Sequence, residues 1–157
     1  MTAQPPASLA LDKLGIPHQT FTHTGPIHSI EQAAAERNQD TDQVIRSIVF
    51  RISEGDYAMV LIAGVHQISW KALRQHFNTS RLTMASPDEV LAVTGYKVGT
   101  VSPFGIKTEI PILADSNIFH PDAVSMGSGI SGTAILMRKE DLKQALGEIE
   151  VGNFCQC

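Results

Sequence analysis

The sequence predicts a mixed α/β domain, and three observations lead to this prediction. The chain has 157 residues, of which 43% are hydrophobic, so it holds enough apolar material for a core without disulfides. Segments in which every second residue is apolar, as in a strand, alternate along the chain with segments that carry helix start and stop signals. No internal repeat, low-complexity tract or linker divides the sequence, so we expect a single domain over residues 1–157.

The N-terminal part predicts two helices with a strand between them. Residues 7–14 predict a short helix, and Gly15 supplies the signal that ends it. Residues 18–23 alternate between polar and apolar side chains, which favours a strand. A second helix is expected to begin at Ser29, because Gln32 follows at the spacing of a capping box.

The middle of the chain predicts a β-hairpin followed by a helix. Residues 45–52 and 57–63 are rich in β-branched and other apolar side chains, and each run has the length of a strand. Residues 54–56 read Glu-Gly-Asp, a turn sequence that would join the two strands as an antiparallel pair. Ser69 is the expected cap of a helix over residues 70–77.

The last part of the chain predicts further strands and two more helices. Residues 81–85 favour a short strand, and the helix expected over residues 87–94 has a strong start signal. Ser86 would cap that helix, Pro87 stands at its first position, and Gly95 would end it. The remaining expected elements are strands over residues 110–114, 123–126 and 133–138 and a helix over residues 139–146.

Charge and hydropathy exclude several classes of protein. The chain has 12 basic and 16 acidic residues, a formal net charge of −4, so we expect neither DNA binding nor extended contact with a nucleic-acid backbone. A local contact with a nucleic-acid end stays compatible with this charge. No apolar run approaches the roughly 18 residues that a membrane span needs. The N-terminus does not resemble a signal peptide, so the expected location is cytoplasmic, without a membrane partner.

Metal-ligand patterns are weak in this sequence. Cys155 and Cys157 lie within the last three residues, where we expect a frayed tail with two free thiols. As an alternative, this C-x-C pair could hold a soft metal together with ligands from elsewhere in the chain. His23 and His28 are five residues apart but have no convincing third ligand. These patterns therefore predict no metal site.

Residues 95–105 are the segment most suggestive of chemistry. This stretch has three glycines and one proline in eleven residues, between an expected helix and an expected strand. Backbone N–H groups that such a loop exposes can hold an oxyanion, a phosphate or an adenine edge. Lys97 and Lys107 add local positive charge. A rigid structural loop is the alternative, and composition alone does not decide between the two.

Two further features could belong to the same pocket. Residues 127–132 match G-x-G-x-x-G, but a strand is expected after them instead of the helix of a dinucleotide site. We therefore interpret them as a loop that walls the same pocket as residues 95–105. Arg46 stands at the start of an apolar strand, either as a solvated strand end or as a fixed cation that faces the pocket.

Residues 95–105, GYKVGTVSPFG, resemble the G-Y-x-x-G-x-x-S-P-[LF]-G loop of the YbaK/EbsC family. Members of that family are freestanding aminoacyl-tRNA deacylases, similar to the editing domain inserted in bacterial prolyl-tRNA synthetases. The resemblance covers roughly residues 7 to 147. The other segments that resemble the family, in the same order, are 21–23 with 29–34, 42–50, 110–115 and 127–132.

The resemblance implies a fold, a reaction and a set of site residues. The implied fold is α+β, with a curved, largely antiparallel sheet of six or seven strands surrounded by helices. The implied reaction is hydrolysis of the ester that joins a small amino acid, such as Cys, Ala or Ser, to the 3′-terminal adenosine of tRNA. Arg46 and Gly99 would be catalytic, and the resemblance implies neither a metal nor an organic cofactor. The implied substrate-binding residues are Phe21, His23, Ser29, Gly95, Tyr96, Lys97, Ser102, Pro103, Phe104, Gly105, Gly127, Ser128 and Gly129.

The implied partner is the acceptor end of an aminoacyl-tRNA. Because a chain of net charge −4 would bind mainly that end, we also expect an aminoacyl-tRNA synthetase as a partner that delivers the tRNA. The late glycine segment departs from the family, whose deacylases can carry a serine and an acid there. The nearest positions in this chain are Gly127 and Ala134, with Ser128 shifted by one, so the amino-acid specificity stays open.

A second departure concerns the reaction itself, because Arg46 stands where the family has a lysine tied to activity. An arginine stays protonated and cannot act as a base, but it can bind a phosphate or a carbonyl oxygen. Two interpretations therefore stay open. The chain is either a deacylase that uses Arg46 as a fixed cation, or a non-catalytic module that binds an aminoacyl-tRNA or nucleotide. In both, Arg46 is expected in the pocket wall, near residues 95–105.

Overall fold

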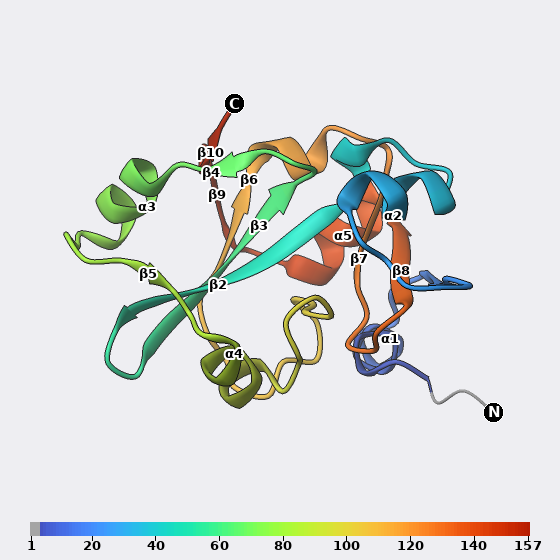
Figure 1. The fold of residues 1–157 in the computed structure, drawn as a ribbon, viewed down its shortest axis with the longest axis horizontal. Coiled ribbons are helices and arrows are strands. Elements are labelled where there is room, and N and C mark those ends of the chain that lie inside the picture. Colours follow the sequence, from blue (N-terminus) through green and yellow to red (C-terminus); the bar gives the residue numbers. More distant parts are fainter. Residues whose placement is uncertain (1–3) are drawn as a thin grey trace.

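The computed structural model describes residues 4–157, so residues 1–3 of the expected domain lie outside the described part (Figure 1). Helices and strands mix along the chain, which confirms the predicted fold class. The helices are α1 (Pro6–Leu14), α2 (Ile30–Glu36), α3 (Trp70–Phe77), α4 (Pro87–Thr94) and α5 (Lys139–Leu146), with 3₁₀ helices η1 (Thr41–Gln43) and η2 (Ser116–Phe119). The strands are β1 (Gln19–Thr22), β2 (Ile45–Ser53), β3 (Asp56–Ala63), β4 (Gln67–Ile68), β5 (Thr83–Met84), β6 (Ile112–Asp115), β7 (Ala123–Gly127), β8 (Thr133–Arg138), β9 (Glu150–Gly152) and β10 (Cys155–Gln156).

The strands form a five-stranded sheet, a three-stranded sheet and a two-stranded pair. Their orders are β5-β2-β3-β6-β9, β1-β8-β7 and β10-β4. The longest pairings, β2 with β3 and β7 with β8, are antiparallel, whereas β6 pairs in parallel with β3 and β9. An isolated parallel bridge joins Val44, the residue before β2, to Ser125 of β7. The two larger sheets therefore meet along the beginning of β2.

The helix start signals in the sequence coincide with side chains that cap helices in the structure. Ser86 accepts a hydrogen bond from the amide of Glu89 at the start of α4, as the capping-box spacing predicts. Ser29 caps α2 in the same way, through the amide of Gln32. The strand expected over residues 81–85 is shorter than predicted. Its first residue is held in a local turn, because Thr79 Oγ1 bonds both the amide and the carbonyl of Arg81.

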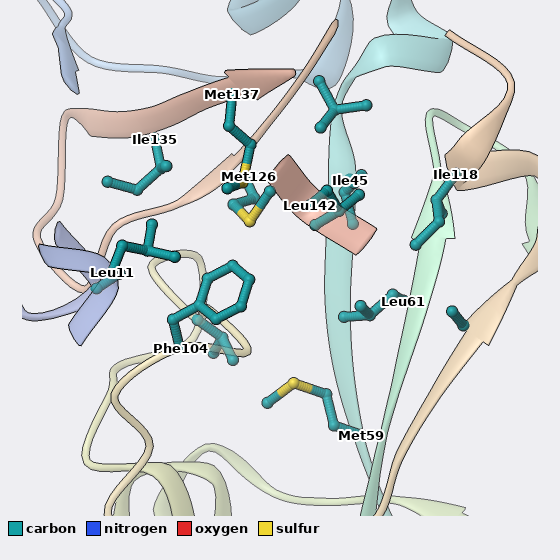
Figure 2. Close-up of a cluster of buried hydrophobic side chains, with 14 of the residues drawn as sticks. Leu11, Ile45, Met59, Leu61, Phe104, Ile118, Met126, Ile135, Met137 and Leu142 are labelled. Carbon is teal, nitrogen blue, oxygen red and sulfur yellow. The ribbon is translucent and has the colours of Figure 1, made fainter. Parts of the chain in front are cut away.

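Strand β3 lies between two hydrophobic clusters, because successive side chains of a strand point to opposite faces. Met59, Leu61 and Ala63 belong to the larger cluster, while the residues between them pack in the second. This explains the continuous apolar run of β3, which is typical of a strand covered on both faces. Figure 2 shows the larger cluster, which includes both Leu11 of α1 and Phe104.

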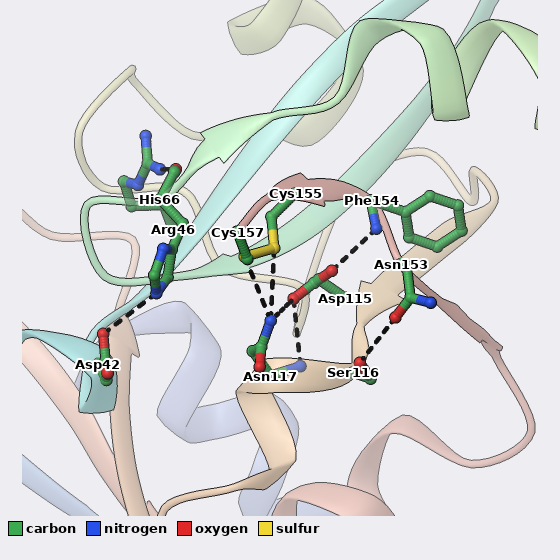
Figure 3. Close-up of a disulfide and its surroundings, with 10 residues drawn as sticks. All are labelled: Asp42, Arg46, His66, Asp115, Ser116, Asn117, Asn153, Phe154, Cys155 and Cys157. Carbon is green, nitrogen blue, oxygen red and sulfur yellow. Dashed lines mark hydrogen bonds and ion pairs between the residues drawn. A yellow bond between two sulfur atoms is a disulfide. The ribbon is translucent and has the colours of Figure 1, made fainter.

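The C-terminal tail differs from the prediction of a frayed end with free thiols. Residues 155–156 form β10, which pairs with β4, and a disulfide joins Cys155 to Cys157 (Figure 3). The tail is anchored because Phe154 is buried in the second cluster and its amide donates to Asp115 Oδ1 at 2.8 Å. An isolated apolar residue in a polar tail was too weak a signal to predict this anchor.

Within residues 4–157, no helix has the length and apolar character that crossing a bilayer requires.

Candidate active site

A cavity of about 760 Å³ opens where the two larger sheets meet. Its walls come from the approach to α2 and α2 itself, the start of β2, the glycine-rich loop after α4, the end of β7 and the segment that leads into β8. The lining residues are His23, Gly25, Pro26, Ile27, Ser29, Ile30, Ala33, Arg37, Val44, Ile45, Arg46, Ser47, Ile48, Val98, Gly99, Thr100, Val101, Met126, Gly127, Ser131, Gly132 and Thr133.

The glycine-rich loop, residues 95–105, folds back on itself. Gly95, Gly99 and Gly105 all have positive φ angles, between 75° and 92°, which lets the chain reverse direction. The hydroxyl of Tyr96 donates to the carbonyl of Phe104 at 2.5 Å and closes the loop from inside. Burial raises the pKa of Tyr96 to about 12, so the phenol keeps its proton. The loop therefore has a fixed conformation, and only residues 98–101 of it line the cavity.

Replacing Tyr96 by phenylalanine is expected to lower the free energy of unfolding by about 1–3 kcal/mol, because the buried carbonyl of Phe104 would lose its partner. Urea denaturation measures this loss. Tyr57→Phe is the matched control, since the Tyr57 hydroxyl bonds the carboxylate of Glu89, which water can replace. Equal losses in the two variants would contradict the assigned role of Tyr96.

The two glycine segments pack directly against each other, as the sequence interpretation expects. The amide of Gly129 donates to the carbonyl of Thr100 at 2.9 Å. A Cβ atom on Gly127 would lie only 2.3 Å from the carbonyl oxygen of Val101. Residue 127 must therefore be glycine for the loop to approach β7 this closely.

The cavity gathers five of the residues expected in the site: Arg46, Gly99, His23, Ser29 and Gly127. Other expected residues lie outside the lining, because the loop turns inward on itself. Tyr96 and Ser102 are buried and bond within the loop, and Phe21 contacts the ring of His23 edge-on. The expected residues outside the lining are Phe21, Gly95, Tyr96, Lys97, Ser102, Pro103, Phe104, Gly105, Ser128 and Gly129.

Arg46 lies in the cavity wall with residues 98–101 of the loop, as expected. Its Nε donates to the carbonyl of Gly64 at 2.7 Å, and Nη2 donates to the carbonyl of His66. Partial burial lowers the pKa of the guanidinium, although an arginine stays charged in proteins. These bonds to the turn between β3 and β4 fix the position of the charge.

Sequence reasoning missed a second arginine of the cavity, Arg37. Its Nε donates to His23 Nε2 at 3.1 Å, and its Nη1 donates to Ser125 Oγ at 3.0 Å. Because His23 Nε2 accepts that bond, Nδ1 carries the ring proton and donates to Glu36 Oε1 at 2.8 Å. Both nitrogens of His23 are thus engaged. The dipeptide Glu36-Arg37 at a helix end carries no sequence signal that distinguishes it from a solvated pair.

The Glu36–His23 pair predicts an acid-sensitive contribution to stability. The hydrogen bond from His23 lowers the pKa of Glu36 below its ordinary value of 4.5. A depressed carboxyl pKa stabilises the fold above the unfolded pKa, and this contribution is lost as the pH falls through the folded value. Urea midpoints measured from pH 6 down to about pH 3 should therefore fall more steeply for wild type than for Glu36→Gln. Parallel curves would contradict the pairing.

Ser47, next to Arg46, adds a feature that points to a ligand. Its Oγ is buried in the cavity wall and has no hydrogen-bond partner among the described residues. A buried hydroxyl without a partner is costly, so a ligand that reaches it would gain a hydrogen bond. The described lining includes two arginines but no carboxylate. The cavity thus suits a ligand with an anionic or strongly polarised oxygen.

Comparison with known proteins identifies the family. The model of the aminoacyl-tRNA editing domain matches residues 24–145. A proline–tRNA ligase from Staphylococcus saprophyticus is 31% identical over 117 residues, which are 74% of this chain and 20% of the ligase. A proline–tRNA ligase from Pseudothermotoga lettingae is 31% identical over 105 residues, or 67% of this chain and 18% of the ligase. The chain thus spans about a fifth of the length of these relatives.

Solved structures share the fold over nearly the whole chain. A candidate trans-editing enzyme for prolyl tRNA synthetase superposes with a TM-score of 0.88 at 21% identity, covering 99% of this chain and all of the other. A hypothetical protein superposes with a TM-score of 0.86 at 18% identity, covering 96% of this chain and 99% of the other. Because the model of the aminoacyl-tRNA editing domain matches most of its length, the chain belongs to the aminoacyl-tRNA editing domain family.

Proposed function

We propose that this protein hydrolyses mischarged aminoacyl-tRNA in trans, at the ester that joins a small amino acid to the 3′-terminal adenosine. One observation carries the proposal: residues 98–101 of the glycine-rich loop and the fixed charge of Arg46 line the same cavity. Membership of the editing family supplies the reaction class, and the likeness to a candidate trans-editing enzyme supports action in trans. The proposed setting is the cytoplasm, where charged tRNA is used.

The loop would act by stabilising the tetrahedral oxyanion that forms when the ester is attacked. The amide of Thr100 is already bonded to the carbonyl of Lys97. The amides of Gly99 and Val101 have no such acceptor in the described part of the chain and are our proposed donors. One well-placed donor contributes about 3 kcal/mol to catalysis in other enzymes.

Water is the proposed nucleophile. An aminoacyl ester is already reactive, so positioning and charge stabilisation suffice without a covalent intermediate. His23 is not the base in this arrangement, because Arg37 and Glu36 engage both of its ring nitrogens.

The proposed substrate end is the acceptor terminus of tRNA carrying a small side chain such as Cys, Ala or Ser. Ile27, Ile30 and Met126 give the cavity apolar walls, and one methylene changes discrimination by only about 1–3 kcal/mol in such a pocket. A chain of net charge −4 would depend little on the tRNA body, so we propose that an aminoacyl-tRNA synthetase delivers the substrate.

A panel of tRNAs charged with Cys, Ala, Ser, Thr or Pro tests the reaction. Catalytic amounts of protein should speed deacylation of at least one small aminoacyl-tRNA well above its spontaneous rate. No acceleration on any member of the panel would refute the proposed function.

A non-catalytic binding module is the second candidate, favoured by one observation. Arg46, which replaces the family's lysine, donates two of its N–H groups to backbone carbonyls instead of leaving them all for a substrate. A module of this kind would bind a non-hydrolysable aminoacyl-adenosine analogue and show no turnover on the panel. Multiple turnover on any substrate would reject it.

A further inference from the structure

A second cluster of reactive side chains lies at the C-terminal tail, where η2 and β10 meet (Figure 3). Asp115, Cys155 and Cys157 each offer one ligand atom, and these three atoms lie within 4.8 Å of one another. In the structure the two sulfurs are joined as a disulfide. We propose that the reduced form of this cluster is a binding site for a thiophilic divalent cation such as Zn²⁺.

The strand geometry of the tail brings the two sulfurs to one side. Residues two apart in a strand point to the same face, so a C-x-C pair that begins in β10 presents both thiols together. The Cα atoms of Cys155 and Cys157 are 5.5 Å apart. This separation lets both sulfurs reach one cation at the Zn–S distance of about 2.3 Å.

Asp115 supplies the third ligand and the strongest reason to expect a cation. Its side chain is 1% exposed, yet no lysine, arginine or histidine of the described chain forms an ion pair with it. Its oxygens accept from three neutral donors: the amides of Asn117 and Phe154 and the side-chain amide of Asn117. A carboxylate has about four acceptor positions, so one remains for a metal. A buried anion without a positive partner favours a cation nearby.

The surroundings orient the ligands and leave an entry path. The side-chain amide of Asn117 donates to Asp115 Oδ2 at 2.9 Å and lies 3.3 Å from each sulfur. This amide nitrogen thus contacts all three ligand atoms, so the Asn117 side chain must turn aside before a cation can bind between them. Cys157 is exposed, whereas Asp115 is buried, so a cation can enter from solvent. Two sulfurs and one carboxylate leave one position of a tetrahedral ion for water or the Asn117 carbonyl oxygen.

The proposal requires reduction before metal binding. A phosphine reductant cleaves the sulfur–sulfur bond: two electrons reduce the disulfide to two thiols, and the phosphine takes up the oxygen of one water to become its oxide. The water supplies the two thiol protons. Binding of Zn²⁺ then releases these two protons, because thiolates are the ligands. The disulfide form has no thiolate to offer and should not bind.

Metal titration of the purified full chain tests the site. After reduction and removal of the phosphine, the protein should take up one equivalent of Zn²⁺ from a chromophoric chelator, and the oxidised protein should take up none. Co²⁺ should give a thiolate charge-transfer band. Cys155→Ser and Cys157→Ser should both abolish that band. A reduced wild type that binds no metal would overturn the proposal.

The role of Asp115 is tested separately. Asp115→Asn should weaken Zn²⁺ binding by more than the roughly 10- to 100-fold that loss of an outer-shell partner costs. Asp122→Asn, which changes a fully exposed carboxylate, should bind as wild type does. In case Asp115→Asn does not fold, zinc X-ray absorption of the wild type gives the answer, with two sulfur and two lighter scatterers expected. Four sulfurs, which means a metal shared between two chains, or unchanged binding in a folded Asp115→Asn would overturn the three-ligand site.

Discussion

Replacing Arg46 by alanine is expected to reduce deacylation about tenfold to a hundredfold. The variant would lose a charged hydrogen bond to the substrate, which is worth about 1.5–3 kcal/mol, or roughly one to two factors of ten in rate. Rates on the best substrate of the charged-tRNA panel measure this effect. Arg51→Ala is the matched control, because Arg51 lies further along β2, outside the cavity, and pairs loosely with Glu89 at 3.8 Å. Equal losses in the two variants would contradict a role of Arg46 in the site.

Arg46→Lys distinguishes the two proposed functions. If the arginine acts as a substitute cation, lysine should keep the wild-type rate within about a factor of ten, since a positive charge stays in the same wall. A rise from a near-zero wild-type rate would instead support the non-catalytic module. Urea denaturation of each variant is needed beside the rates, because Arg46 also holds the turn at Gly64 and His66.

Replacing Gly127 by alanine is expected to impair both stability and activity. The new Cβ would lie 2.3 Å from the carbonyl oxygen of Val101 and 2.8 Å from that of Thr100, and both obstacles are backbone atoms. Overpacking of this kind lowers the free energy of unfolding by about 1–3 kcal/mol. We expect a loss at the upper end of this range, because backbone atoms cannot move aside as a flexible side chain can. Moving residues 100–101 would also displace the proposed oxyanion donors.

Gly25→Ala is the matched control for this substitution. Gly25 lines the same cavity, has no positive φ angle, and a Cβ there would meet no atom within 4 Å. Thermal unfolding and deacylation rates should therefore stay close to wild type in Gly25→Ala and fall together in Gly127→Ala. Wild-type behaviour of Gly127→Ala would show that the two glycine segments do not pack as described.

Local sequence patterns predicted much of the fold because the interactions that they encode are local. The cap of α4 depends on Ser86 and Glu89, three residues apart, and the hairpin β2–β3 depends on one short turn. The double burial of β3 follows from its unbroken apolar run. The prediction of a frayed C-terminal tail was wrong because the order of the tail depends on contacts with residues distant in sequence. The main one is the hydrogen bond between Phe154 and Asp115.

The site was predictable only in part for the same reason. The glycine pattern predicted where the loop lies in the sequence, but not which of its residues line the cavity. Gly95, Gly99 and Gly105 have left-handed backbone conformations, and only residues 98–101 line the cavity. The bond between His23 and Arg37 joins residues fourteen apart, and no spacing in the sequence encodes it. Sites assembled from several elements need the tertiary structure.

The central claim is that the cavity between the glycine-rich loop and Arg46 seats the aminoacyl-adenosine end of tRNA. Amide chemical shifts of the labelled protein, titrated with a non-hydrolysable aminoacyl-adenosine analogue, test it most directly. We predict saturable shifts at Gly99, Val101 and Ser47, which line the cavity. Shifts confined to another surface, such as the face of α3 that carries Lys71 and Arg74, would contradict the claim. So would the absence of any saturable shift.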